Sequence, residues 1–175
     1  MQYGLISKRK GVDQFLSVID EIKNEDIEVW FIGEVEKSYQ TTFFNKIAKH
    51  SFIKYLGIKS FEDIMVLYAQ VYCVVVPSLL IENYPNTVLE AIANRTLVIG
   101  SNRGGIPELI KDNRFLFDIL DLESFKNSIN TALNTNAEQY KTVTEQSFSI
   151  IYNNNAPEMY YQRLMEIYYT IIAKK

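Results

Sequence analysis

Short apolar runs alternate with amphipathic segments along most of this chain, and this alternation limits the folds that it can adopt. The runs CVVV (residues 73–76) and LVIG (97–100) are continuous and rich in β-branched residues, which is typical of strands covered on both faces. Helices are expected between the strands, and further strands are predicted at residues 3–6, 27–33, 52–57 and 114–117. Repeated strand–helix units predict an α/β fold with a doubly wound parallel sheet, Rossmann-like, with right-handed crossovers.

After residue 134 the pattern becomes helical only, over residues 137–155 and 156–175. In the last helix six residues share one face by their spacing: Tyr160, Tyr161, Leu164, Ile167, Tyr168 and Ile171. We expect this face to pack on the core of its own domain. The alternative is an interface with a second domain, because aromatic faces often serve interfaces.

The length of 175 residues suits one domain with a full core, so we treat residues 1–175 as a single domain. Because a strand is predicted almost directly at Met1, we expect the chain to be part of a longer protein. No segment approaches the roughly 20 apolar residues of a membrane span, and the N-terminus does not resemble a signal peptide. The single cysteine, Cys73, lies in an apolar run and is expected to be a buried, inert thiol in a reducing cytoplasm.

The charge and the motif content exclude several classes of function. A formal net charge of -3 argues against a nucleic-acid partner, which usually meets a basic surface. Neither a G-x-G-x-x-G nor a G-x-x-x-x-G-K-S/T motif is present, so a dinucleotide site or a P-loop is unsupported. The chain also has no His/Cys pair with metal-ligand spacing and no Asp-x-Asp, so we expect no metal and no other cofactor.

Polar residues gather in three segments that follow predicted strands, at residues 7–11, 77–86 and 101–107. In open α/β sheets, ligands bind at this carboxyl end of the strands. In the second segment Pro85 suits the start of a helix. The first-turn N–H groups of that helix, on Asn86, Thr87 and Val88, are expected to attract an anion.

Two glutamates flank Pro85 and suggest an extended ligand. Glu82 precedes the predicted helix, and Glu90 lies about one turn inside it, roughly 7 Å along the axis at a rise of 1.5 Å per residue. The two carboxylates can therefore contact different ends of one ligand whose anionic centre lies between them.

Residues 77–110 resemble the donor site of retaining family 4 glycosyltransferases, which have the GT-B fold. The resemblance rests on two glutamates separated by seven residues (Glu82 and Glu90), a small-residue helix, a strand and the Gly-Gly-Ile-Pro-Glu turn at 104–108. Residues 4–16 (GLISKRKGVDQFL) and 53–78 resemble two further motifs of that family, in the same order. The resemblance therefore covers nearly the whole chain.

This resemblance implies a role for each matching residue. Glu82 would lie at the transferred sugar and Lys10 at the diphosphate, which makes these two the catalytic candidates. Glu90 would accept hydrogen bonds from the ribose, and the main chain at Gly57 and Ile58 would meet the base. The backbone of residues 83–86 would hold the sugar hydroxyls. The remaining implied donor-binding residues are therefore Asn83, Tyr84, Asn86 and Thr87.

The whole chain would then be the C-terminal, nucleotide-sugar-binding half of a retaining, metal-independent, hexosyltransferase-like enzyme of polysaccharide biosynthesis. Its partners would be a nucleoside diphosphate sugar, a glycan or lipid-linked acceptor, and an N-terminal acceptor domain that lies outside this chain. We expect it in the cytoplasm, or peripherally at the inner face of the membrane. The isolated chain is expected to lack transferase activity, because transfer requires a positioned acceptor.

The sequence departs from the family pattern at two places. Leu5 stands where the family usually has an arginine that contacts phosphate. Two outcomes are open: Lys8 or Arg9 fills that role, or the affinity for the donor is lower. Residues 82–85 read Glu-Asn-Tyr-Pro where Glu-Gly-Phe-Gly is common, and Pro85 removes one N–H donor. The Gly104–Gly105 pair is compatible with either turn geometry or ligand contact.

Two other functions fit parts of the pattern. A nucleotide-sugar epimerase-like GT-B protein would bind a similar donor without an acceptor. A non-catalytic regulatory α/β module would need an acidic cluster at the first strand ends, where this chain has the basic residues 8–10.

Overall fold

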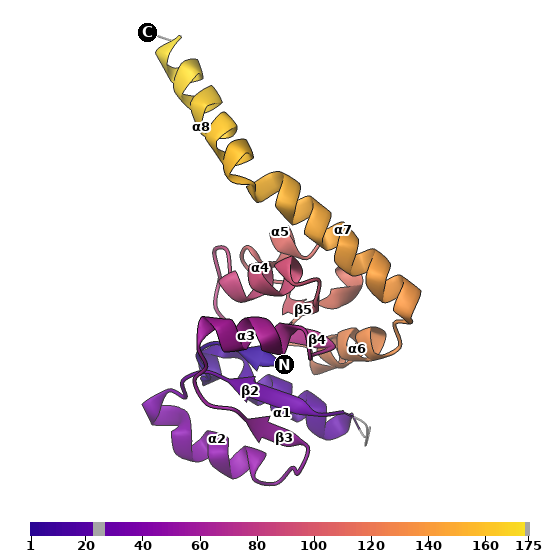
Figure 1. Cartoon of the computed structure of the whole chain (residues 1–175). Coiled ribbons are helices and arrows are strands. Elements are labelled where there is room, and N and C mark those ends of the chain that lie inside the picture. The colour runs from indigo at the N-terminus through magenta and orange to yellow at the C-terminus, as the bar shows by residue number, and fades with distance from the viewer. Residues whose placement is uncertain (23–26, 174–175) are drawn as a thin grey trace.

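A computed structural model of the chain describes residues 1–22 and 27–173 (Figure 1). The strands are β1 (Gln2–Tyr3), β2 (Val29–Ile32), β3 (Ile53–Tyr55), β4 (Cys73–Val76), β5 (Leu97–Ser101) and β6 (Leu116–Phe117). The α-helices are α1 (Val12–Glu21), α2 (Gln40–Ile47), α3 (Phe61–Tyr68), α4 (Asn86–Ala93), α5 (Ile106–Leu109), α6 (Leu122–Leu133), α7 (Ala137–Asn155) and α8 (Pro157–Ile172). Short 3-10 turns are η1 (Lys8–Lys10), η2 (Lys37–Tyr39) and η3 (Asn113–Phe115). None of the helices in the described part of the chain is long and apolar enough to cross a bilayer.

The strands form two parallel ladders, β1-β2-β3 and β4-β5-β6, which meet between β1 and β4. At this seam the N–H of Val75 donates to the carbonyl of Met1, and the Met1 ammonium donates to the carbonyl of Cys73, each at 2.8 Å. The order across the molecule is therefore β3-β2-β1-β4-β5-β6, which confirms the predicted parallel α/β arrangement. Cys73 is half-buried rather than fully buried, and desolvation raises the pKa of its thiol.

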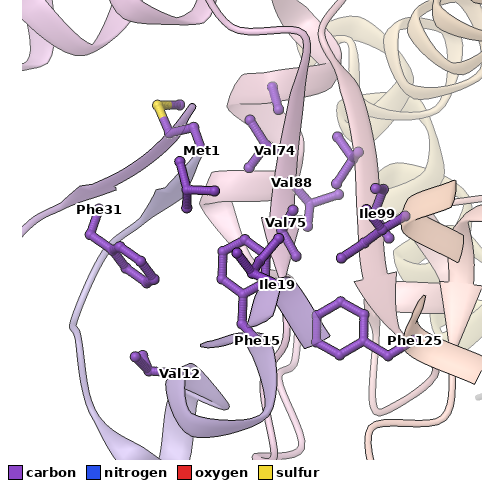
Figure 2. Packing of buried hydrophobic residues seen from close by; sticks show 14 of the residues in the cluster. Met1, Val12, Phe15, Ile19, Phe31, Val74, Val75, Val88, Ile99 and Phe125 are labelled. Atoms are coloured by element: carbon purple, nitrogen blue, oxygen red, sulfur yellow. The ribbon is translucent and has the colours of Figure 1, made fainter. Parts of the chain in front are cut away.

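Aromatic side chains in contact with one another join the two ladders on one side of the sheet. Phe15 of α1 lies 5.7 Å from Phe31 of β2 and 5.9 Å from Phe125 of α6, measured between ring centroids. Phe125 in turn stacks on Phe117 of β6 at 3.8 Å. Figure 2 shows Phe15, Phe31 and Phe125 around this interior, together with Val75 of β4. Because these rings come from both halves of the chain, burying them ties the halves into one core.

The strand β5 is buried along its whole length. Successive side chains of a strand point to opposite faces, so helices must cover both faces of the sheet here. The helices that contact β5 are α4, α5, α6 and α7. This cover explains why the run LVIG carries no polar alternation.

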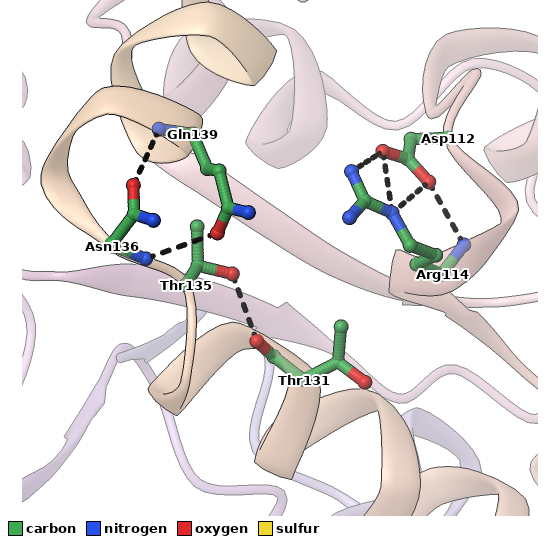
Figure 3. Close-up of polar contacts among 6 residues, drawn as sticks. All are labelled: Asp112, Arg114, Thr131, Thr135, Asn136 and Gln139. Atoms are coloured by element: carbon green, nitrogen blue, oxygen red, sulfur yellow. Dashed lines mark hydrogen bonds and ion pairs between the residues drawn. The ribbon is translucent and has the colours of Figure 1, made fainter.

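A capping box sets the start of α7 (Figure 3). The side-chain oxygen of Asn136 accepts from the N–H of Gln139 at 2.9 Å, and the side chain of Gln139 accepts from the N–H of Asn136 at 3.3 Å. Immediately before it, the hydroxyl of Thr135 donates to the carbonyl of Thr131 at the end of α6. These local bonds fix where the chain leaves α6 and begins the helix that packs on α4.

The expectation that the last helix packs on the core of its own domain is wrong. Helix α8 projects away from the sheet (Figure 1), and none of its described side chains is buried. Ala156 is extended before Pro157, as a residue before proline prefers, and the chain changes direction there. Helical periodicity identified an apolar face but could not identify what covers it. The alternative, contact with a second domain, stays a prediction.

Ending the chain after Ala156 should therefore change the free energy of unfolding by less than about 0.5 kcal/mol, as for other changes to exposed surface. Urea unfolding followed by Trp30 fluorescence would measure this. A loss of about 2 kcal/mol or more would instead show that α8 packs on the domain in solution.

Candidate functional site

A hollow opens where the carboxyl ends of β1 and β4 meet, which is where the strand order reverses direction. Its walls include the end of β1, the last residue of η1 and the segment between β4 and α4. Ligands bind to doubly wound sheets at this position. Among the candidates, Lys10, Glu82 and Thr87 line the hollow, as does Leu5, which is exposed at its edge.

Lys10 and Glu82, which are 72 residues apart in the sequence, form an ion pair in this hollow. The Nζ of Lys10 lies 2.5 Å from Oε1 of Glu82. The hydroxyl of the buried Ser78 donates to the same oxygen at 2.7 Å and accepts from the N–H of Leu80 at 3.2 Å. Desolvation raises the pKa of Glu82, but the hydrogen bonds from Lys10 and Ser78 and the charge of Lys10 outweigh it and hold the pKa below its usual value. Glu82 is therefore an ionised carboxylate that is held in place by two hydrogen bonds.

Backbone contact between two segments brings Lys10 to Glu82. Gly11 has a positive φ of 69°, and a Cβ there would lie 1.6 Å from the carbonyl oxygen of Pro77. The N–H of Leu79 donates to the carbonyl of Arg9 at 3.0 Å beside this contact. Only glycine allows such an approach, so the residue after Lys10 must be glycine for the pair to form.

The Gly104–Gly105 turn supports Glu82 from the other side. The N–H of Gly105 donates to the carbonyl of Glu82 at 2.7 Å. A Cβ on Gly105 would lie 1.7 Å from the carbonyl oxygen of Asn83, and one on Gly104 would lie 2.3 Å from that of Glu82. Close packing on the Glu82 backbone therefore explains both glycines without a ligand.

Glu90 lies half-buried on α4 and has a partner that the sequence analysis did not name. Its Oε2 accepts a hydrogen bond of 3.1 Å from the hydroxyl of Tyr68 in α3. Desolvation, and to a smaller extent the charge of Glu90, raises the pKa of Tyr68. The same two causes raise the pKa of Tyr3 on the wall of the hollow. In the sequence, only Tyr68 itself could have pointed to this contact, because a tyrosine in the core needs a partner for its hydroxyl.

At the start of α4, one of the three N–H groups that were expected to be free already has a hydrogen-bond partner. Pro85 precedes the helix, and its carbonyl accepts from the N–H groups of Val88 and Leu89, at 3.0 and 3.3 Å. The expectation that the Val88 N–H is free for an anion is therefore wrong. Asn86 and Thr87, at the first two helical positions, keep N–H groups without a partner inside the helix.

The remaining candidates lie in exposed loops at this edge of the sheet. Asn83 and Tyr84 follow Glu82 directly and are exposed. Gly57 and Ile58 follow β3, two strands away from β1. The carbonyl of Gly57 already accepts from the N–H of Gly33 at 2.9 Å, and Ile58 is 72% exposed. The structure thus brings Lys10 together with Glu82 and leaves Gly57 and Ile58 outside their hollow.

Within residues 1–22 and 27–173, no group of three or more His, Cys, Asp or Glu side chains is placed to hold a metal ion.

Known proteins share both the sequence pattern and the fold. The model of the family described as "Glycosyl transferases group 1" matches residues 1–149. A glycosyltransferase from Rickettsia africae is 22% identical and has a TM-score of 0.84 over 99% of this chain and 48% of its own. HepE from Anabaena in complex with UDP is 19% identical, with a TM-score of 0.84 over 97% of this chain and 48% of its own. Sucrose-phosphate synthase from Thermosynechococcus elongatus is 18% identical, with a TM-score of 0.80 over 99% and 45%.

This chain therefore spans about half the length of those solved structures. The likeness confirms the predicted fold, one half of a GT-B fold. No curated protein sequence matches the chain.

We predict that Gly11→Ala costs at least about 3 kcal/mol of stability, because a left-handed backbone and a steric clash add together. Gly57→Ala is a matched control. Its φ of 73° is nearly the same, but a Cβ there would meet nothing within 4 Å. It should cost only about 1–2 kcal/mol, the penalty for the left-handed conformation. Equal losses in urea unfolding would contradict the contact between Gly11 and Pro77.

The lowered pKa of Glu82 predicts how its contribution to stability depends on pH. A carboxylate whose pKa falls on folding stabilises the folded state above its unfolded pKa, ordinarily 4.5 for Glu, and this contribution is lost as the pH falls through the folded value. At pH 7 the wild type should be more stable than Glu82→Gln by about 0.5–1 kcal/mol, since the pair is partly exposed. As the pH falls below 4.5 and through the lower folded-state pKa, the difference should shrink towards zero. Unfolding curves at several pH values measure it, and a constant difference would contradict the prediction.

Proposed function

The chain belongs to the glycosyl transferases group 1 family, and we propose that it is the donor-binding half of a retaining glycosyltransferase whose donor is a nucleoside diphosphate sugar. One observation carries the proposal: Lys10, Glu82 and the first turn of α4 meet in one hollow at the switch point of the sheet. Cations and helix N-termini bind diphosphates, and a carboxylate beside them suits a sugar. The Anabaena structure with UDP makes uridine diphosphate the first ligand to test.

Each candidate then has a distinct role. Lys10 and the N–H groups of Asn86 and Thr87 bind the diphosphate, which gains negative charge as the glycosidic bond breaks. Glu82 lies at the transferred sugar. Glu90, further along the helix, accepts hydrogen bonds from the ribose.

The segments next to these groups complete the proposed donor site. The backbone of Asn83 and Tyr84 holds the sugar hydroxyls, and the main chain at Gly57 and Ile58 meets the base. The positive groups named above balance the diphosphate, so the proposed site requires no metal ion.

Donor binding must rearrange the ion pair between Lys10 and Glu82. In the free chain Glu82 neutralises the same ammonium that the diphosphate requires. A bound diphosphate offers Lys10 a higher charge, and the exchange leaves Glu82 free to meet the sugar. Ser78 keeps the carboxylate in place during the exchange because it donates to the same oxygen.

The acceptor, a glycan or a lipid-linked sugar, would be held by a second domain of the kind that completes the longer relatives. We therefore expect no transfer by the isolated chain. An epimerase-like GT-B protein remains the second candidate, because it would use the same donor contacts without an acceptor.

Calorimetry with UDP and GDP tests the proposal. Glu90→Ala should weaken binding of the preferred nucleotide by about 1.5–3 kcal/mol, the range for a hydrogen bond to a charged group. Glu82→Ala should not weaken nucleotide binding, since the partner of Glu82 in the proposed site is the sugar and its removal frees Lys10 for the diphosphate. A chelator should leave the affinity unchanged. No binding of either nucleotide at millimolar concentration, or equal losses from both substitutions, would contradict the proposed site.

A further inference from the structure

The hydroxyl of Tyr68 reaches the carboxylate of Glu90 from a neighbouring helix. It lies 3.1 Å from Oε2 of Glu90 and 3.4 Å from the carbonyl of Thr87, on the same helix α4. A hydroxyl has one proton to donate, and the shorter distance and the charge both favour the carboxylate. Tyr68 therefore holds one of the two oxygens of Glu90.

The position of Tyr68 does not depend on Glu90. Tyr68 is only 1% exposed and belongs to the hydrophobic core. Its carbonyl accepts from the buried hydroxyl of Thr96 at 3.1 Å, which links the end of α3 to the turn after α4. A ring packed in this way has few alternative rotamers, so its hydroxyl is already in place before any ligand binds.

We propose that Tyr68 is a positioning residue for the donor: it holds Oε2 of Glu90 and so presents the other oxygen, Oε1, to the ribose hydroxyls. This inference rests on the proposed function. A glutamate on a helix surface has several rotamers, and ordering it at the moment of binding lowers affinity. Tyr68 lowers the entropic cost of ordering Glu90 during binding, because it already holds the Glu90 side chain in one arrangement.

The consequence is a specific effect on ribose recognition. Tyr68→Phe keeps the ring and removes only the hydroxyl that orients Glu90. Binding of UDP should weaken by about 3- to 10-fold, which corresponds to the loss of one hydrogen bond. Binding of 2′,3′-dideoxyuridine diphosphate, which has no ribose hydroxyls for Glu90 to meet, should be unchanged.

The experiment measures both ligands by calorimetry on the 175-residue chain as wild type, Tyr68→Phe, Glu90→Ala and the double variant. The preference for UDP over its dideoxy analogue should fall in Tyr68→Phe and in Glu90→Ala. The double variant should match Glu90→Ala alone, because Tyr68 acts only through Glu90. Tyr39→Phe is the matched control: Tyr39 is also buried, and its hydroxyl donates to a carboxylate, that of Asp13, at 2.5 Å. This control should keep the full preference for UDP.

Several results would overturn the inference. Equal weakening of both ligands by Tyr68→Phe would show a general structural role, and so would a further loss when Tyr68→Phe is added to Glu90→Ala. An unchanged preference would show that Tyr68 does not position Glu90, although the proposed donor site would stand. If the wild type binds neither UDP nor GDP, the proposed function fails, and this inference fails with it.

Discussion

Close contact between loop backbones is the constraint on which the site depends. Gly11 lies against the carbonyl of Pro77, and Gly105 lies against that of Asn83, at distances that exclude any side chain. These contacts bring the loops 7–11, 77–86 and 101–107 together at one point of the sheet edge, and the loop that carries Glu82 lies between the other two. Lys10 and Glu82 meet because their backbones have already been brought together, and the ion pair follows from that geometry.

The sheet halves contribute different groups to this point. The half built from β1, β2 and β3 supplies Lys10, and the half built from β4, β5 and β6 supplies Glu82 and Glu90. The halves are held together on the sheet by the contacting rings of Phe31, Phe15, Phe125 and Phe117. A substitution of one of these rings would therefore alter the site by shifting the two halves relative to each other, although no polar residue of the site is changed.

Sequence patterns predicted the features that are local or repeated. The β-branched runs at 73–76 and 97–100 identified central strands, and the spacing around Pro85 located the helix that carries Glu90. Contacts between distant segments were not readable in this way. Nothing in the sequence links Tyr68 to Glu90, because the contact depends on how α3 packs on α4. The free face of α8 was likewise misassigned, since periodicity does not state what covers a helix.

The ion pair in the hollow also bears on which ligands the proposed site would accept. Glu82 is the counter-ion of Lys10, and an anion that binds Lys10 in the proposed site would have to replace it. A neutral sugar or nucleoside cannot make this exchange, and an anion of single charge offers Lys10 little more than the carboxylate it displaces. A diphosphate carries more charge in a compact group and can also use the first turn of α4. In the proposed site the pair would therefore set a minimum charge for a ligand, and this selection would precede recognition of the sugar or the base.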